Sequence, residues 1–287
     1  MSIELIRKRL NSYKLTSKEG ELNAIKEIFQ EIALCALSRT DFFKNSAFMG
    51  GTCLRILHGL SRFSEDLDFA LLSPDRAFRW SSLLDSLSLE FEAYNLHLEV
   101  QDREDATNAV KKAFLKEDSF GKALQLTYER KKSDVQKVLI KLEVDTNPPA
   151  GAHSESVMVR FPFPFSVRAH NLPSLCAGKC LALLCRKFHK GRDWFDFLWY
   201  VSQNIVPNFE MLSSGLKQQG PWKGKVLSVN DTWLLDALHS KVSEVDWTAA
   251  RDEVRPFLSG PDLANLRNWS QDYFHQNVDL FLRLPHV

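Results

Sequence analysis

Several features that mark other classes of protein are missing from this sequence. No uncharged apolar run reaches about 18 residues, so we expect no membrane-spanning segment. The N-terminus is charged and amphipathic and lacks the apolar stretch of a signal peptide, which predicts a cytoplasmic protein. No low-complexity tract occurs, and 44% of the residues are hydrophobic, as in an ordinary soluble globular protein.

Cysteine is scarce and is not arranged for metal binding. The chain has five cysteines, an odd number, and no close Cys or His pairs at the spacing of zinc ligands. Cys176, Cys180 and Cys185 fall at helical spacing in an apolar segment, so we expect them to act as small buried hydrophobes. A structural zinc site is therefore not expected.

An excess of either charge is also missing. The net charge of +1 argues against a protein that binds nucleic acid by bulk electrostatics alone. A locally basic face and a merely solvated face both remain open for one stretch of 31 residues. Its basic residues are Lys111, Lys112, Lys116, Lys122, Arg130, Lys131, Lys132, Lys137 and Lys141.

The N-terminal half mixes helical and strand patterns. Thr16 to Glu19 read as a capping box before apolar residues at helical spacing up to Leu37. Ser73 and Pro74 are predicted to open a second helix that carries Trp80 to Phe91. Residues 124–128 and 138–144 alternate between apolar and polar, as strands do.

The C-terminal half is predicted to be helical from Leu172 onward. Before it, residues 157–165 contain Pro162 and Pro164 and are expected to form an edge strand or an extended arm. We therefore predict an α/β core with N-terminal helices over residues 1–165 and a helical region over residues 166–287.

Asp66 and Asp68 are the first candidates for chemistry. On a strand, residues two apart point to the same face, so both carboxylates share one face while Leu67 and Phe69 pack on the other. Two carboxylates so close repel each other unless a cation lies between them, and oxygen ligands suit Mg²⁺ or Mn²⁺. A solvated strand face is the structural alternative.

A Gly-Gly-Thr run lies upstream of this pair. Gly50 and Gly51 allow the backbone to approach a ligand closely, and the helix predicted after them presents free N–H groups to a phosphate. Thr52 is predicted to cap that helix and to offer its hydroxyl to the same anion. A plain turn and cap is the alternative.

A third carboxylate is available in the strand predicted at 138–144. Glu143 and Asp145 share one of its faces, and if this strand lies beside the Asp66 strand, three carboxylates converge. They could then hold metal ions for an in-line phosphoryl displacement, or take the proton from the attacking hydroxyl. An exposed acidic strand face is the alternative.

Charged residues also interrupt the helical half. Lys179 falls within an apolar helix, where an unpaired ammonium is costly, so it must reach solvent or pair with an anion such as a triphosphate. Asp193 and Asp196 are neighbours on a helix face, and a salt bridge with Arg186 or Arg192 is their structural alternative.

Taken together, three blocks of sequence resemble the AbiEii/AbiGii-type toxin nucleotidyltransferases of the polymerase-beta-like superfamily. The blocks are GGTCLRILHGLSRFSEDLDF, IKLEVDTNPP, and AGKCLALL with KGRDWFDFLWY after it, and they lie within residues 15–205. The resemblance implies an α+β (α/β) fold with a polymerase-beta-like nucleotidyltransferase core, a mixed sheet and a helical C-terminal region. It also implies an active site between the two parts.

The resemblance assigns expected roles to individual residues. Asp66, Asp68 and Glu143 are the expected metal ligands, and Glu143 ranks before Asp145 because hydrophobic residues flank it on both sides. The expected catalytic set adds Asp145, Lys179 and Asp196. The expected nucleotide contacts are Gly50, Gly51, Thr52, Arg62, Ser64, Lys179, Arg192 and Asp193.

The resemblance further implies Mg²⁺ or Mn²⁺ as cofactor, an NTP as substrate and RNA, such as the 3′ end of a tRNA, as acceptor. It implies a separately encoded antitoxin and a role in a toxin–antitoxin or phage-defence pair. Three rivals stay open: a metal-dependent nuclease or phosphodiesterase, nucleotide transfer onto a protein, and a catalytically silent binding module.

Overall fold

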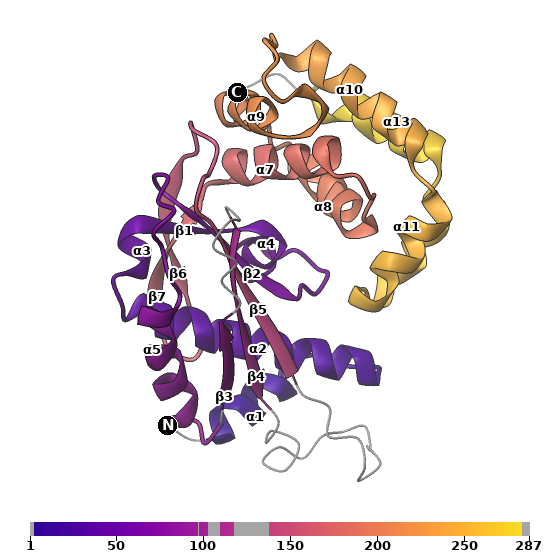
Figure 1. Cartoon of the computed structure of the whole chain (residues 1–287). Coiled ribbons are helices and arrows are strands. Elements are labelled where there is room, and N and C mark those ends of the chain that lie inside the picture. The colour runs from indigo at the N-terminus through magenta and orange to yellow at the C-terminus, as the bar shows by residue number, and fades with distance from the viewer. Residues whose placement is uncertain (1–2, 97, 103–109, 118–137, 283–287) are drawn as a thin grey trace. The chain divides into compact units, whose positions relative to one another are not determined.

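The structure is a computed structural model that describes residues 3–96, 98–102, 110–117 and 138–282 (Figure 1). It divides into two compact units. Unit 1 comprises Met1–Pro148 and Ser156–Ala169, and unit 2 comprises Pro149–Glu155 and His170–Val287. Because compactness does not test independent folding, the domain boundary at residue 165 stays a prediction.

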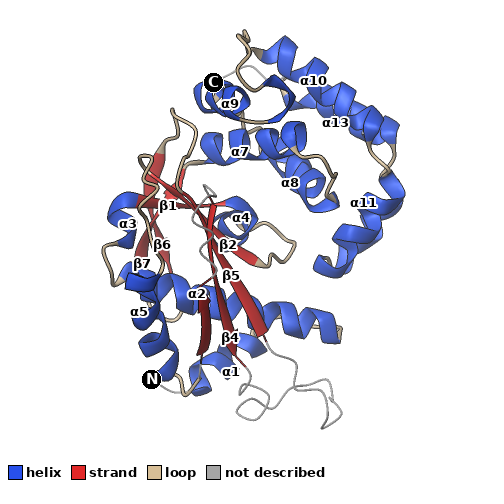
Figure 2. Cartoon of the chain, in the orientation of Figure 1, coloured by secondary structure: helices blue, strands red, loops and turns tan. Residues whose placement is uncertain are grey.

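Unit 1 is built on a mixed sheet, which Figure 2 shows in red. The described strands follow the order β3-β4-β5-β2-β1-β7-β6. β2 runs parallel to β5 and antiparallel to β1, whereas β3, β4 and β5 pair antiparallel. The strands are β1 (Ser46–Met49), β2 (Asp66–Leu71), β3 (Leu98–Asp102), β4 (Val110–Glu117), β5 (Val138–Asp145), β6 (Ser154–Val159) and β7 (Phe165–His170).

Helix α2 is the longest described helix of unit 1, and it packs against α1, α5 and β5. Its side chains at Ile25, Ile28, Phe29 and Ile32 are fully buried, which explains why the helical period is so clear in the sequence. Phe29 meets Phe91 edge-to-face at 5.8 Å. The helices of this unit are α1 (Ile3–Asn11), α2 (Lys18–Ser38), α3 (Phe42–Asn45), α4 (Gly50–His58) and α5 (Ser81–Glu92).

Two predicted helix starts are wrong. Helix α2 begins at Lys18, so Ser17 rather than Thr16 is the N-cap, and its hydroxyl accepts the Gly20 N–H. Helix α5 begins at Ser81, not after Ser73 and Pro74.

The segment before α5 is held in another conformation by contacts that local sequence does not reveal. The Asp75 N–H donates to the Thr146 carbonyl, and the Asp75 carboxylate accepts the Ala77 N–H. Trp80 is fully buried in an aromatic cluster with Phe42 and Phe78. These tertiary contacts override the local helix signal.

The strand prediction for 138–144 is confirmed by β5. Residues 157–159 belong to β6, the last strand in the sheet order, whereas Phe165 begins β7. The strand predicted at 124–128 lies outside the described residues, as does every member of the basic stretch from Lys122 to Lys137.

Unit 2 is helical, as predicted from Leu172 onward. A cluster of aromatic rings forms part of its core: Trp247 stacks on Phe274 at 3.9 Å, and Trp194 contacts both. Cys176 and Cys180 are buried as predicted, but the prediction is wrong for Cys185, which is only half-buried at the end of α7. The helices are α7 (Leu172–Cys185), α8 (Gly191–Ser202), α9 (Phe209–Gln218), α10 (Asp231–Glu244), α11 (Trp247–Val254), α12 (Gly260–Asn265) and α13 (Gln271–Phe281). None of the helices described in either unit is long and apolar enough to span a membrane.

The start of α8 lies directly against α11. A Cβ added at Gly191 would overlap the Ala250 carbonyl oxygen, far inside van der Waals contact. Gly178 in α7 is different, because its added Cβ would meet only Met211 Cε, at 4.0 Å. Gly191 therefore leaves no space for a side chain, whereas Gly178 has space for a methyl group.

We expect Gly191→Ala to lower the free energy of unfolding by about 1–3 kcal/mol or more, because the backbone of α8 or α11 must move. The matched control Gly178→Ala should raise it by up to about 1 kcal/mol, since alanine favours a helix interior. Urea unfolding of both variants measures this. A Gly191→Ala protein as stable as the wild type would contradict the close packing of α8 on α11.

Candidate active site

The carboxylates of β2 occupy the less buried face of that strand. Asp66 and Asp68 are half-buried, whereas Leu67 and Phe69 between and after them are fully buried on the opposite face. The alternation expected from the sequence is therefore present, and it directs both carboxylates to one side of the sheet.

The Gly-Gly pair that begins α4 lies against this face. Gly50 has a φ of +80°, and a Cβ added there would lie 2.5 Å from Asp68 Oδ2. A Cβ on Gly51 would lie 2.5 Å from Arg62 Nη2 and 3.2 Å from Ser64 Oγ. The positive φ of Gly50 favours glycine there, and these close approaches show that five of the predicted site residues lie together within unit 1.

Thr52 plays a different local part from the predicted one. Helix α4 begins at Gly50, its N-cap is Met49, and no side chain caps it, so the predicted cap at Thr52 is wrong. The Thr52 side chain is fully buried, and its hydroxyl donates to the main-chain carbonyl of Asp66. It therefore ties α4 to the start of β2. A phosphate contact from this hydroxyl stays a prediction.

The strand that carries the third carboxylate does lie beside β2. In the parallel register, Glu143 is level with Asp68, and Asp145 is level with Ala70. Asp145 accepts the Asn147 N–H at 2.9 Å. Burial raises the pKa of Asp145, against the opposing effect of that hydrogen bond. Glu143 is thus the carboxylate in register with the β2 pair.

Lys141 lies among these carboxylates, which the sequence reasoning did not foresee. Its ammonium pairs with Glu143 Oε1 at 2.6 Å. Burial alone would lower the pKa of Lys141, but the Glu143 hydrogen bond and charge, with the charges of Asp66 and Asp68, outweigh it and raise the pKa. The sequence does contain an indication of this position, because Lys141 lies two residues before Glu143 and so shares its strand face.

This arrangement shows that the acidic face accommodates a cation. The charges of three carboxylates favour the charged form of one ammonium, and their oxygens are of the kind that Mg²⁺ and Mn²⁺ prefer. Within the described residues, however, no three His, Cys, Asp or Glu side chains are gathered closely enough to hold a metal ion. The carboxylate chemistry fits a divalent ion, and Glu143 as the third ligand stays a prediction.

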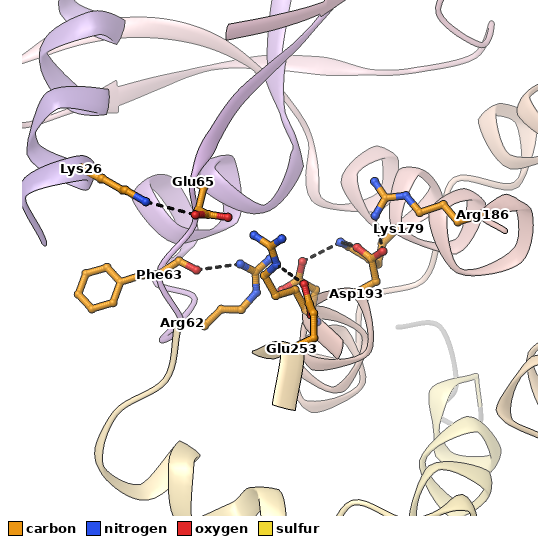
Figure 3. A network of polar contacts seen from close by, with 10 residues as sticks. Lys26, Arg62, Phe63, Glu65, Lys179, Arg186, Asp193 and Glu253 are labelled. Carbon is orange, nitrogen blue, oxygen red and sulfur yellow. Dashed lines mark hydrogen bonds and ion pairs between the residues drawn. The ribbon is translucent and has the colours of Figure 1, made fainter. Parts of the chain in front are cut away.

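Helix α2 holds the loop that connects α4 to β2. Gln30 Nε2 donates to the Ser64 carbonyl at 3.2 Å, and Lys26 pairs with Glu65 at the same distance (Figure 3). These contacts fix the segment at Ser64 and Glu65. Sequence patterns do not reveal them, because a polar residue on a helix looks the same whether it faces solvent or a loop.

A buried ion pair reinforces the same loop. Arg55 Nε binds Glu27 at 2.5 Å, and its Nη1 donates to the carbonyls of Leu60 at 3.0 Å and Ser61 at 2.6 Å. Arg62, only 3% exposed, donates to the Phe63 carbonyl at 2.9 Å. The loop is therefore braced where it carries Arg62 over Gly51.

Unit 2 contains a second charged cluster at the residues predicted from its helices. Lys179 pairs with Asp193 at 2.6 Å and with Asp196 at 2.7 Å, and Arg186 pairs with Asp193 from the other side (Figure 3). Asp196 is fully buried. The anion that Lys179 requires is thus supplied by the protein, and its predicted phosphate contact stays a prediction.

Arg192 is directed elsewhere in unit 2. Its Nε donates to Glu253 Oε1 at 2.8 Å, and its guanidinium lies 4.3 Å from the centroid of the Phe257 ring. Of the two salt-bridge partners considered for Asp193, Arg186 pairs with it, whereas these contacts of Arg192 are with Glu253 and Phe257. A nucleotide contact by Arg192 also stays a prediction.

Comparisons with known proteins identify the family. The family model described as "Nucleotidyl transferase AbiEii toxin, Type IV TA system" matches residues 32–273. The chain belongs to the AbiEii nucleotidyltransferase toxin family. It is therefore a nucleotidyltransferase, and the family implies an NTP as substrate, typically a divalent metal ion, and an antitoxin partner.

Two solved structures share the fold of this AbiEii chain. MenT4, a nucleotidyltransferase toxin from Mycobacterium tuberculosis H37Rv, is 15% identical with a TM-score of 0.55, covering 99% of this chain and 91% of its own. JHP933 from Helicobacter pylori is 15% identical with a TM-score of 0.51, covering 94% of this chain and 92% of its own. At this identity they show the fold alone, and they confirm the predicted α+β class. No curated protein matches the sequence.

We expect Gly50→Ala to weaken the binding of an NTP with Mg²⁺ by about tenfold or more, because the new Cβ displaces Asp68. Gly59→Ala is the matched control: its φ of +75° carries a similar backbone strain, but nothing lies within 4 Å of its added Cβ. Isothermal titration measures binding, and thermal unfolding shows whether the strain costs are alike. Equal binding by the two variants would show that the Gly50 turn does not serve the AbiEii site.

Proposed function

We propose that this chain transfers a nucleotide from an NTP to a hydroxyl group of an RNA, and that it acts in the cytoplasm as the toxin of a toxin–antitoxin or phage-defence pair. One observation carries the proposal: the Asp68 carboxylate approaches Gly50, the first residue of α4, so closely that a Cβ added there would lie 2.5 Å from Oδ2. A phosphate held by that turn would lie beside the carboxylates of β2. A nucleotidyltransferase requires its phosphate-binding groups and its acidic metal ligands to lie next to each other.

In the proposed site, Asp66 and Asp68 would hold Mg²⁺ or Mn²⁺ together with Glu143, whose ion pair with Lys141 would have to open. The bound ion would neutralise the charge of the triphosphate during the displacement. Lys141 keeps the acidic face compensated while the site is free of ligand, because close carboxylates repel each other without a cation.

The phosphates bind, in this proposal, at the turn itself. The nine-residue helix α4 directs the free N–H groups of its first turn, including Gly51, toward an anion. Arg62 lies over Gly51, where its guanidinium adds positive charge, and Ser64 adds a hydroxyl. Thr52 contributes by fixing α4 to β2. Contacts from Lys179, Arg192 and Asp193, and a catalytic role for Asp196, rest on the family resemblance.

The attacking hydroxyl must lose a proton. We assign its acceptance to Glu143 before Asp145, because Glu143 is level with Asp68 in the register of β2 and β5. Positioning of the two reactants and compensation of charge supply most of the rate in such transfers.

We expect Asp66→Asn with Asp68→Asn to reduce nucleotide transfer by at least about a hundredfold, since the double variant loses the acidic ligands of the metal. The assay uses Mg²⁺, each α-labelled NTP in turn, total bacterial RNA and lysate protein. Asp85→Asn is the control, because Asp85 is an exposed carboxylate of α5.

The product of the reaction distinguishes the rivals. Label on RNA that disappears in the double variant supports the proposal, whereas label on a protein band moves the acceptor to a protein. Shortened RNA without label indicates a nuclease. Absence of any product with every NTP would leave a binding module whose Gly-Gly turn is an ordinary helix start.

A further inference from the structure

The loop between α7 and α8 exposes an aromatic ring. Residues 186–190 read Arg-Lys-Phe-His-Lys, and Phe188 is 82% exposed. Phenylalanine is normally buried, and burying a side chain of this size gains about 1.5–3 kcal/mol. A single exposed apolar residue needs no explanation by itself, so the surroundings of Phe188 decide its meaning.

Those surroundings are basic. Lys187 and Lys190 are exposed on either side of the ring, and neither forms an ion pair with any residue that the structure describes. Burial lowers the pKa of the His189 imidazole. The charge of Lys241 in α10 lowers this pKa further, whereas the charge of Glu244 opposes the shift. The loop therefore concentrates positive charge on a chain whose net charge is only +1.

The loop is also held firmly at both ends. Arg186 is paired with Asp193, which itself is buried and paired with Lys179. Gly191, directly after the loop, is packed against the Ala250 carbonyl. Figure 3 shows the Arg186 end of this arrangement. A ring presented from a fixed base loses less conformational entropy on binding than one on a loose segment.

The positive charge and the exposed ring of this loop together indicate what kind of partner it binds. Alternating cations and a ring suit a single-stranded nucleic acid, whose phosphates pair with lysines and whose unstacked bases stack on aromatic side chains. A protein interface would need a larger apolar core, and Phe188 is the one large apolar side chain that residues 186–190 expose; Val226, Leu263 and Leu280, which are also exposed in the described part of unit 2, are not part of this loop.

We propose that residues 186–190 bind the single-stranded end of the acceptor RNA, with Phe188 stacked on a base and Lys187 and Lys190 on the flanking phosphates. This inference rests on the proposed function in taking RNA as the acceptor. It deepens that function by assigning acceptor binding to a part of unit 2 that carries none of the predicted metal ligands.

The test is binding of a short fluorescent single-stranded RNA by the full chain, measured by polarisation. Phe188→Leu, which keeps an apolar side chain but removes the ring, should bind about tenfold more weakly, and Phe188→Trp should bind within about twofold of the wild type. Leu280→Ala is the matched control, because Leu280 is an exposed apolar residue of α13. Lys187→Gln with Lys190→Gln should make binding less sensitive to salt. The slope of log K against log salt concentration should become shallower by about 0.7 for each phosphate that no longer pairs with a lysine.

Binding and transfer separate this inference from the proposed function. Phe188→Leu should raise KM for the RNA and leave KM for the NTP unchanged. If no NTP supports transfer but RNA binding still depends on the ring, the proposed function fails and the binding surface stands. If Phe188→Leu binds and transfers to RNA as the wild type does, the binding surface is overturned. Equal losses for Phe188→Leu and Phe188→Trp would also overturn it, since stacking would then not be the cause.

Discussion

The contact between the Asp68 carboxylate and the backbone of Gly50 is the constraint on which the rest of the candidate site depends. A Cβ at Gly50 would lie 2.5 Å from Asp68 Oδ2, so β2 and the turn before α4 leave no room for any side chain. Thr52 fixes the same two elements together through the Asp66 carbonyl. A helix start and an acidic strand are thereby held adjacent, so the proposed phosphate site would lie beside the proposed metal ligands.

This adjacency is supported from behind by α2. Its buried Glu27 pairs with Arg55, which in turn holds the carbonyls of Leu60 and Ser61, and its Gln30 holds the Ser64 carbonyl. Leaving a buried carboxylate such as Glu27 without its partner would cost several kcal/mol, so these contacts hold the loop strongly. The longest helix of unit 1 therefore does more than fill the core.

The sequence predicted the parts of the site that obey local rules. Alternation placed Asp66 and Asp68 on one strand face, and the period of two in β5 placed Glu143 and Asp145 on another. It could not predict the start of α5, because Asp75 and Trp80 are held by partners distant in the chain. Nor could it predict which loop a polar residue of α2 contacts, since that depends on tertiary packing alone.

Both acidic clusters of the chain carry their own cations, and this has a consequence for ligand binding. Lys141 compensates the carboxylates of unit 1, whereas Lys179 and Arg186 compensate Asp193 and Asp196 in unit 2. Buried carboxylates without such partners would destabilise the ligand-free fold. A metal ion or a phosphate bound as proposed would then replace an existing partner rather than fill an uncompensated site. Breaking the existing ion pair costs free energy and so offsets part of the free energy gained from the new contact. The affinity of each ligand therefore reflects the difference between the new contact and the ion pair that it replaces.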